Sequence, residues 1–249
     1  MTNGAESELS HLERTLRDDP ATAGAAGFDR LRLADVPFVP EVRLHLAVDP
    51  IVWEARLQAE TGTAVAPPFW ASAWAGGQAV ARYVLDHPDV VTGRRVLDLA
   101  SGGGIVAISA ALAGAASVTA NDIDPYALAA LTLNARANGV VVHGYRGDLL
   151  AGDADGADVV LAGDVFYSRP LADRVMAFIE RVAARGALVL VGDPGRAYLP
   201  HHRLEIVASY PVSRIGPPED AEITRVHVLR PRPRPRGAPP APPASTPRS

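Results

Sequence analysis

The chain of 249 residues contains neither cysteine nor lysine. The absence of cysteine excludes disulfide bonds, thiolate metal sites, iron–sulfur clusters and a cysteine nucleophile. No run of about 18 apolar residues is available to span a bilayer, and the polar, acidic first ten residues do not resemble a secretory signal. We therefore expect a cytoplasmic protein that has no membrane partner and no metal site.

The distribution of charge argues against a nucleic-acid partner. All 24 basic residues are arginine, and with 28 acidic residues the net charge is −4. Several of these arginines lie in a Pro/Arg-rich end of the chain without acids, so the remaining body is more acidic than the whole. An acidic body is a poor platform for a phosphate backbone.

The order of apolar runs and turn residues predicts one α/β domain. We expect a polar N-terminal extension over 1–36 with a short helix at 6–17, a domain over 37–230, and a disordered tail over 231–249. Expected strands are 41–47, 96–100, 117–120, 140–145, 157–162 and 187–191, with a final antiparallel pair at 203–209 and 223–229. Expected helices are 50–60, 79–86, 102–112 after a turn, 125–138 and 171–184. Alternating strands and helices predict a parallel sheet covered on both faces.

A glycine-rich turn is the strongest local signal. The buried run Val96–Ala100 leads directly into Gly102 and Gly104, and a helix follows. Glycines let the backbone pass close beneath a ligand, and a helix N-terminus offers unpaired N–H groups. Asp122 ends the next strand, where a carboxylate can accept both hydroxyls of a ribose. The turn therefore predicts a nucleotide-type ligand.

A dinucleotide is one alternative for this ligand. Gly102-x-Gly104-x-x-Ala107, with Asp122 about 20 residues later, also satisfies the NAD pattern. Three features argue against it. Asp98 lies inside the strand, where a dinucleotide site needs no carboxylate. Little chain follows for a second nucleotide-binding half, and the last two predicted strands form an antiparallel hairpin rather than a βαβ unit.

The segment Asp98-x-Ala100-x-Gly102-x-Gly104 resembles motif I of the class I methyltransferases that use S-adenosylmethionine. The resemblance implies a Rossmann-like sheet of seven strands with helices on both faces and a C-terminal antiparallel hairpin. It also implies that the acid helps hold the methionine end of the cofactor, and that Asp122 binds the ribose. The cofactor-binding residues expected in this way are Trp74, Asp98, Ala100, Ser101, Gly102, Gly104, Asn121, Asp122, Ile123, Asp148, Leu149 and Asp164.

Further strings resemble the lysine methyltransferases of the electron transfer flavoprotein beta subunit and their bacterial relatives. They are Pro40–Leu46, Trp74–Ala79, Asn121–Pro125, Gly163–Tyr167 and Gly192–Arg196. The resemblance covers about residues 38–200 and departs at Ala75, where proline is expected, and at Gly103. It implies a protein substrate that carries a target lysine, with the flavoprotein beta subunit as a candidate. We expect a monomer.

Asp164-Val-Phe-Tyr167 resembles the D-x-x-Y motif of the seven-strand lysine methyltransferases, which implies catalytic roles for Asp164 and Tyr167. Asp164 can orient the incoming amine, and Tyr167 can form a wall of its channel. The alternative makes Asp164 the cap of a short turn and Tyr167 a core aromatic. Trp70 and Trp74 belong either to the channel wall or to the core.

Other interpretations stay open at this stage. Asp193 and Arg196 follow the last parallel strand, where they either shape the substrate entrance or form a turn and an ion pair. A small-molecule or nucleic-acid-base methyltransferase would share the cofactor site, although Val165-Phe166 replaces the two prolines expected for amino groups on bases. A non-catalytic cofactor-binding protein would lack the acceptor groups that are present here.

Overall fold

A computed structural model describes residues 3–17, 30–62, 64–213 and 216–233. Its helices are α1 (Asn3–Arg17), α2 (Pro50–Thr61), α3 (Ala75–Asp86), α4 (Ile105–Leu112), α5 (Pro125–Ala137) and α6 (Arg169–Ala184). Its strands are β1 (Leu31–Val36), β2 (Val39–Ala47), β3 (Arg95–Leu99), β4 (Ser117–Asp122), β5 (His143–Arg146), β6 (Val159–Gly163), β7 (Leu188–Asp193), β8 (Leu204–Pro211) and β9 (Arg225–Pro231). Short 3₁₀ turns are η3 (Phe69–Ala71), η4 (Pro88–Val90), η5 (Ala154–Gly156) and η6 (Pro218–Asp220).

Seven strands form one mixed sheet in the order β5-β4-β3-β6-β7-β9-β8. The five strands from β5 to β7 are parallel, and β9 runs antiparallel to both β7 and β8. The order reverses beside β3, because β4 continues on one side of it and β6 on the other. Such a switch point leaves a crevice at the carboxyl ends of the strands, where open α/β sheets bind ligands. The predicted seven-strand fold and its terminal hairpin are confirmed.

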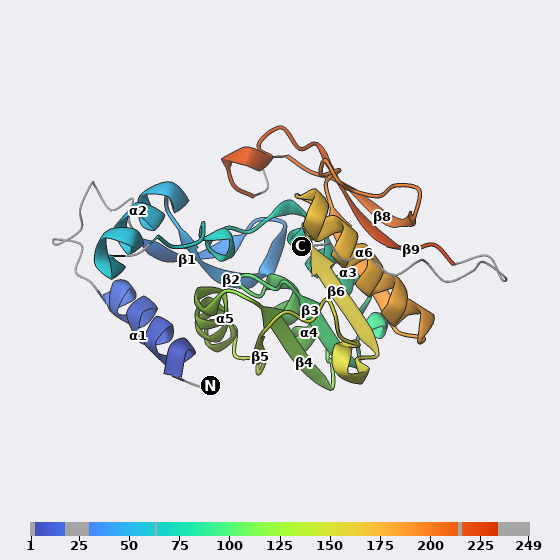
Figure 1. Cartoon of the computed structure of the whole chain (residues 1–249), viewed down its shortest axis with the longest axis horizontal. Helices are drawn as coiled ribbons and strands as arrows, with labels where there is room; N and C mark the ends of the chain where they lie inside the picture. The colour runs from blue at the N-terminus through green and yellow to red at the C-terminus, as the bar shows by residue number, and fades with distance from the viewer. Residues whose placement is uncertain (1–2, 18–29, 63, 214–215, 234–249) are drawn as a thin grey trace, which may run out of the picture.

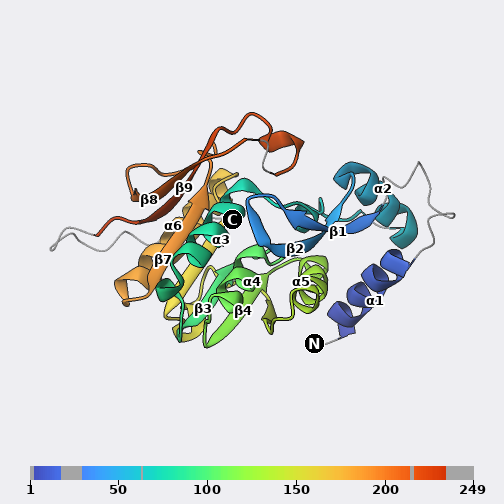
Figure 2. The ribbon, with the colours of Figure 1, turned by 180° about the vertical axis from the view of Figure 1, so that it is seen from behind.

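Helices cover both faces of this sheet (Figures 1 and 2). Val80 of α3 and Ile108 of α4 lie in the core on one face, together with Leu131 of α5. Phe178 and Ile179 of α6 lie in the core on the opposite face. Among the described residues, none of the helices combines the length and apolar character needed to cross a bilayer.

The N-terminal part of the chain packs beside α5. Strand β1 pairs with β2 as an antiparallel hairpin outside the main sheet, and α1 buries Leu12 against α5. The predicted helix at 6–17 is confirmed, but the strand at 31–36 was not expected. The boundary expected between residues 36 and 37 therefore falls in the turn of this hairpin. The tail expected from residue 231 overlaps the end of β9, and residues 234–249 lie outside the described part.

Glycines bring the start of α3 directly onto the ends of β6 and β7. A Cβ at Gly192 would lie 1.9 Å from the carbonyl oxygen of Gly76, and one at Gly163 would lie 2.5 Å from Cα of Gly77. No side chain fits between the helix and the sheet at these points. The prediction placed the start of this helix at Ala79, but α3 begins at Ala75. The reason is that close packing here outweighs the low helix propensity of glycine.

Candidate active site

The turn after β3 lies at the carboxyl edge of the sheet, as predicted. Ala100, Gly102 and Gly104 have φ values of +54°, +51° and +86°. Glycine adopts this region without strain, whereas Ala100 occupies it at a cost that is typical of functional turns. A Cβ at Gly103 would lie 2.7 Å from the carbonyl oxygen of Trp70, so the turn also packs closely against η3.

Asp98 lies beneath the turn rather than in the open crevice. Its side chain is buried, and Oδ2 accepts a hydrogen bond from the Ala107 N–H at 2.9 Å. Burial raises the pKa of Asp98 to about 8, and the charge of Asp122 acts in the same direction. A pKa in this range favours the protonated form of the Asp98 carboxyl at neutral pH.

Asp122 connects the turn to the end of the next strand. Its Oδ2 accepts from the Gly102 N–H at 2.9 Å, and its Oδ1 accepts from the Asp124 N–H at 3.0 Å. Each carboxylate oxygen keeps a second lone pair for a ligand. The Ile123 side chain beside it is 70% exposed at the same edge.

Asn121 fixes the loop that precedes Asp148 and Leu149, two of the expected cofactor-binding residues. Its amide donates to the carbonyl oxygens of Tyr145 and Gly147 at 3.1 and 2.7 Å. The exposed Asp148 that follows is ion-paired with Arg174 of α6, which holds the pKa of Asp148 below its usual value.

Asn134 of α5 ties the glycine turn to the N-terminal hairpin. Its Nδ2 donates to the Gly103 carbonyl oxygen at 2.8 Å. Its Oδ1 accepts from the backbone N–H of His45 in β2 at 2.7 Å and lies 2.9 Å from His45 Nδ1. The Asn134 side chain is fully buried, so these contacts are shielded from water. No pattern in the sequence pointed to this residue.

Asp164 lies next to the end of β6 in a strained backbone conformation. Its φ is +54°, and its N–H donates to the Gly192 carbonyl oxygen at 2.9 Å. Its Oδ2 accepts from the Gly77 N–H at 3.0 Å, in the first turn of α3. Burial raises the pKa of Asp164 to about 6, although the charge of Arg196 works against this increase.

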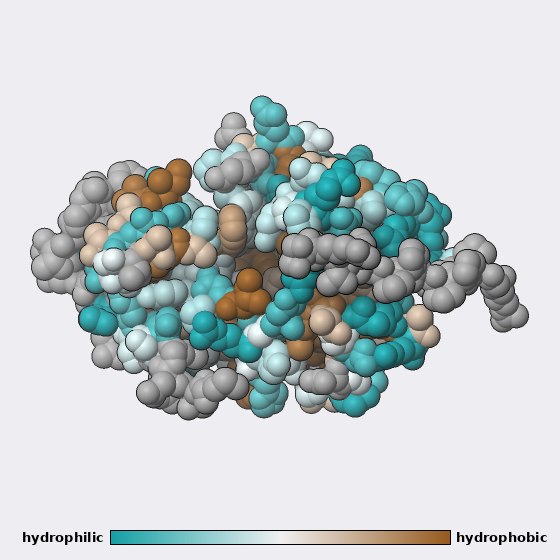
Figure 3. Space-filling model, in the orientation of Figure 1, coloured by the Kyte–Doolittle hydropathy of each residue, from teal (hydrophilic) through white to brown (hydrophobic). Residues whose placement is uncertain are grey.

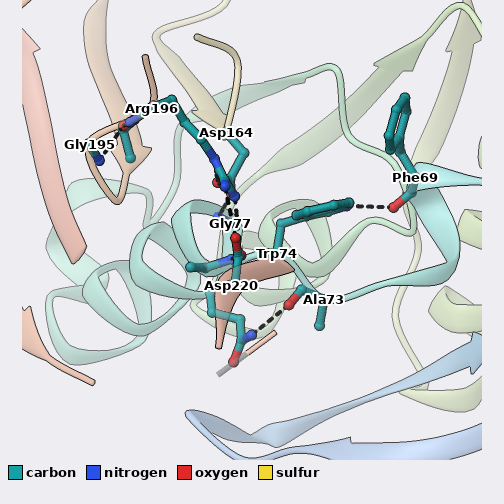
Figure 4. A network of polar contacts seen from close by, with 11 residues as sticks. Phe69, Ala73, Trp74, Gly77, Asp164, Gly195, Arg196 and Asp220 are labelled. Atoms are coloured by element: carbon teal, nitrogen blue, oxygen red, sulfur yellow. Dashed lines mark hydrogen bonds and ion pairs between the residues drawn. The ribbon is translucent and has the colours of Figure 1, made fainter. Parts of the chain in front are cut away.

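Arg196 forms ion pairs with two carboxylates (Figure 4). Its Nε and Nη2 donate to Asp164 Oδ1 at 3.0 and 2.6 Å. Its Nη1 and Nη2 donate to Asp220 Oδ1 and Oδ2 at 2.8 and 3.1 Å. Asp220 is fully buried in η6 and also accepts from the Ala75 N–H at 3.2 Å. The turn predicted at Asp193 and Arg196 is present, but the ion pairs of Arg196 are with Asp164 and Asp220, and sequence reasoning missed Asp220.

Asp193 forms the turn that presents Arg196. Its Oδ1 accepts from the backbone N–H groups of Gly195 and Arg196 at 2.6 and 2.7 Å. Its Oδ2 is buried without a hydrogen-bond partner among the described residues. Burial raises the pKa of Asp193 to about 6.

Aromatic rings stand beside this charged group. The Phe69 ring centroid lies 6.0 Å from that of Trp74 and 6.0 Å from that of Tyr167. Trp74 Nε1 donates to the Phe69 carbonyl oxygen at 2.7 Å, and the Arg196 guanidinium lies 5.5 Å from the Trp74 ring centroid. Phe69 and Tyr167 are about half exposed, whereas Trp70 is buried in the N-terminal core. Figure 3 shows a hollow near the middle of the face that is drawn in Figure 1.

Comparison with known proteins identifies the family. The protein named electron transfer flavoprotein beta subunit lysine methyltransferase from Xenopus laevis is 38% identical over 184 residues, covering 71% of this chain and 74% of that protein. The chain belongs to this family. The protein of the same name from Danio rerio is 43% identical over 139 residues, covering 55% of this chain and 54% of its own length. The chain thus spans about half the length of several of the curated relatives it matches.

Two further similarities concern methyltransferases of ribosomal protein L11. The family model described as ribosomal protein L11 methyltransferase (PrmA) matches residues 82–192. A crystal structure of ribosomal protein L11 methylase from Lactobacillus delbrueckii subsp. bulgaricus has 22% identity and a TM-score of 0.44, covering 63% of this chain and 78% of that one.

Proposed function

We propose that this protein transfers a methyl group from S-adenosylmethionine to a lysine side chain of a protein. The observation that carries the proposal is membership of a family whose members are named lysine methyltransferases, with one match extending over 74% of the relative. Those names support the electron transfer flavoprotein beta subunit as the acceptor. Cytoplasmic location and a monomeric state stay predictions.

The residues at the turn after β3 fit this cofactor. Ser101 Oγ is buried without a hydrogen-bond partner among the described residues, and a buried hydroxyl of this kind calls for a polar ligand atom or water. Asp122 has lone pairs left for two ribose hydroxyls. We propose that Ser101, Gly102, Gly104 and Asp122 hold the cofactor directly. Asp98 supports the turn from beneath through its hydrogen bond with the Ala107 N–H. When bound, S-adenosylmethionine supplies a methyl group activated by its sulfonium.

The acceptor side needs a dry site that places a neutral amine in line. A free lysine amine has a pKa of about 10.4, so its ammonium form must first give up a proton, which we propose passes to solvent water before the amine enters the dry site. We propose that Asp164 supplies fixed negative charge beside the approaching amine and that Phe69, Trp74 and Tyr167 exclude water from it. The half-exposed rings of Phe69 and Tyr167 support this arrangement.

The proposal is tested by methyl transfer to the purified flavoprotein. The full chain is incubated with isotope-labelled S-adenosylmethionine and electron transfer flavoprotein, and mass spectrometry locates the label. We expect it on a lysine of the beta subunit. The chain has no lysine of its own, so automethylation at lysine cannot obscure the result.

Asp164→Ala is the first variant to compare. We expect kcat to fall by about 10²-fold, as for the loss of a positioning group, with a much smaller change in cofactor affinity. Label on histidine, arginine or a small molecule would contradict the lysine assignment. Wild-type turnover by Asp164→Ala would contradict the catalytic role of this residue.

A further inference from the structure

Buried negative charge exceeds buried positive charge around Arg196. Three buried carboxylates, those of Asp164, Asp193 and Asp220, interact with this single guanidinium. They come from the ends of β6 and β7 and from η6, so one arginine joins three separate segments. Removing one partner of such a buried group leaves an uncompensated charge and is strongly disruptive.

The Asp164 carboxylate is held in a fixed direction by these contacts. Arg196 occupies Oδ1 with two donors, and the Gly77 N–H occupies Oδ2. Rotation of the carboxylate would break at least one charge-assisted hydrogen bond, which is among the stronger kinds. Arg196 therefore fixes the position of the Asp164 carboxylate. It also opposes the rise in pKa that burial causes in Asp164.

Arg196 is itself held by Asp220. Arg196 donates two hydrogen bonds to the Asp220 carboxylate, and this bidentate geometry fixes the orientation of the guanidinium as well as its position. Asp220 also accepts from the first N–H of α3 at Ala75, where the helix dipole favours an acid. The Arg196 guanidinium also lies 5.5 Å from the Trp74 ring centroid, and the Trp74 indole N–H donates to the backbone carbonyl oxygen of Phe69.

We infer that Arg196, clamped by Asp220, is a positioning residue for methyl transfer, which makes the β8–β9 connection part of the acceptor site. The inference rests on the proposed lysine methyltransferase function. Arg196 acts through Asp164 and Trp74 rather than by touching the reacting atoms. Its role is to keep Asp164 ionised and the aromatic wall in place.

The test compares Arg196→Gln, Arg196→Lys and Asp220→Asn with the wild type. For Arg196→Gln we expect kcat to fall about 10²-fold, with the acceptor KM and cofactor Kd changed by less than about 3-fold. Asp220→Asn keeps the arginine but loosens it, so a loss of about 10-fold is expected. Arg196→Lys keeps the charge without the bidentate geometry and should recover only part of the activity.

The pH profile separates positioning from a purely structural role. The charged groups that act on Asp164 are Arg196, Asp193 and Asp220. Among the described residues, Asp193 and Asp220 remain near Asp164 when Arg196 is removed, so the acidic limb of the kcat profile should move to higher pH in Arg196→Gln. The control is Arg203→Gln, which removes another partly buried arginine, ion-paired with Glu180 on α6. We expect this control to keep the wild-type profile.

Failure of the inference can be told apart from failure of the proposed function. If the wild type methylates lysine but Arg196→Gln keeps wild-type kcat and acidic limb, or if Arg203→Gln loses as much activity, the inference is wrong. If the wild type does not methylate lysine, the proposed function fails. Urea unfolding then tests separately whether Arg196 keeps Asp164 ionised. Arg196→Gln should then lose stability more steeply than the wild type between about pH 6 and 7.5, because the pKa of Asp164 rises further.

Equal slopes of stability against pH in Arg196→Gln and the wild type would overturn the claim that Arg196 keeps Asp164 ionised. If Arg196→Gln does not fold, adding Asp164→Asn and Asp220→Asn neutralises both acids that Arg196 pairs with. We expect this triple variant to fold, and its failure to do so would contradict the role of charge.

Discussion

Replacing Asp98 with asparagine tests how the buried acid beneath the glycine turn responds to pH. Burial raises its pKa from 3.8 to about 8. A carboxyl whose pKa is higher in the folded state binds more protons there than in the unfolded state. Its contribution to stability is therefore complete below about pH 3.8 and is lost as the pH rises towards 8. Asparagine keeps an oxygen that can accept from the Ala107 N–H but does not ionise.

The size of the effect follows from the width of this pH interval. Each pKa unit corresponds to about 1.4 kcal/mol, so the wild type should lose about 3–4 kcal/mol between about pH 5 and pH 8 from this group. The Asp98→Asn variant has no titrating group at this position, so it should not lose this stability. Other buried acids, such as Asp164 and Asp193, contribute equally to both proteins and cancel in the difference.

Urea unfolding without cofactor at a series of pH values measures the difference directly. Asp158→Asn is a suitable control because Asp158 is exposed and pairs with Arg95, which lowers its pKa to about 2. Its removal should shift the stability curve without changing its slope between about pH 5 and 8. Parallel curves for the wild type and Asp98→Asn would refute the argument that Asp98 is buried and protonated.

Three further predictions concern the remaining parts of the site. Asp122→Ala should weaken binding of S-adenosylhomocysteine by roughly 1.5–3 kcal/mol, the scale of hydrogen bonds to a charged group, and an unchanged dissociation constant by calorimetry would remove Asp122 from the ribose role. Tyr167→Phe should keep more single-turnover activity than Tyr167→Ala if the ring forms the wall, while equal losses would assign the role to the hydroxyl. Gly192→Ala should destabilise the fold by about 1–3 kcal/mol or more in thermal unfolding, because the added Cβ meets the Gly76 carbonyl oxygen. The control Gly152→Ala should be nearly neutral, because the atom nearest to its added Cβ is 3.4 Å away.

Local patterns were sufficient to predict the parallel sheet and the turn after β3. Each buried strand is a short apolar run, and helices α2 and α5 begin with an Asp cap followed by proline, a combination that favours the start of a helix. The edge strand β5 was predicted at 140–145 but begins only at His143, because the apolar run Val140–Val142 lies before the strand and all four residues of the strand are exposed. Strand β1 was missed because it pairs only with β2, outside the main sheet.

The contacts that the sequence could not reveal are those between distant segments. Asp220 stands in a polar stretch between two strands, and nothing nearby marks it as a partner for the Ala75 N–H, which is 145 residues away. Similarly, Gly76 and Gly77 could be read as a loop, because the need for them arises from Gly163 and Gly192 on two other strands. Both features follow from tertiary packing and leave no periodic signal.

The hydrogen bonds of Asn134 limit how this protein can be recombined with its relatives. One buried amide joins β2, α5 and the glycine turn, so these three segments form a single exchangeable module. A chimera that takes its N-terminal hairpin from another methyltransferase would have to import the matching α5 residue as well. The β8–β9 connection meets the rest of the chain at different residues, so it can be exchanged separately as long as Asp220 is kept as the partner of Arg196 and the Ala75 N–H.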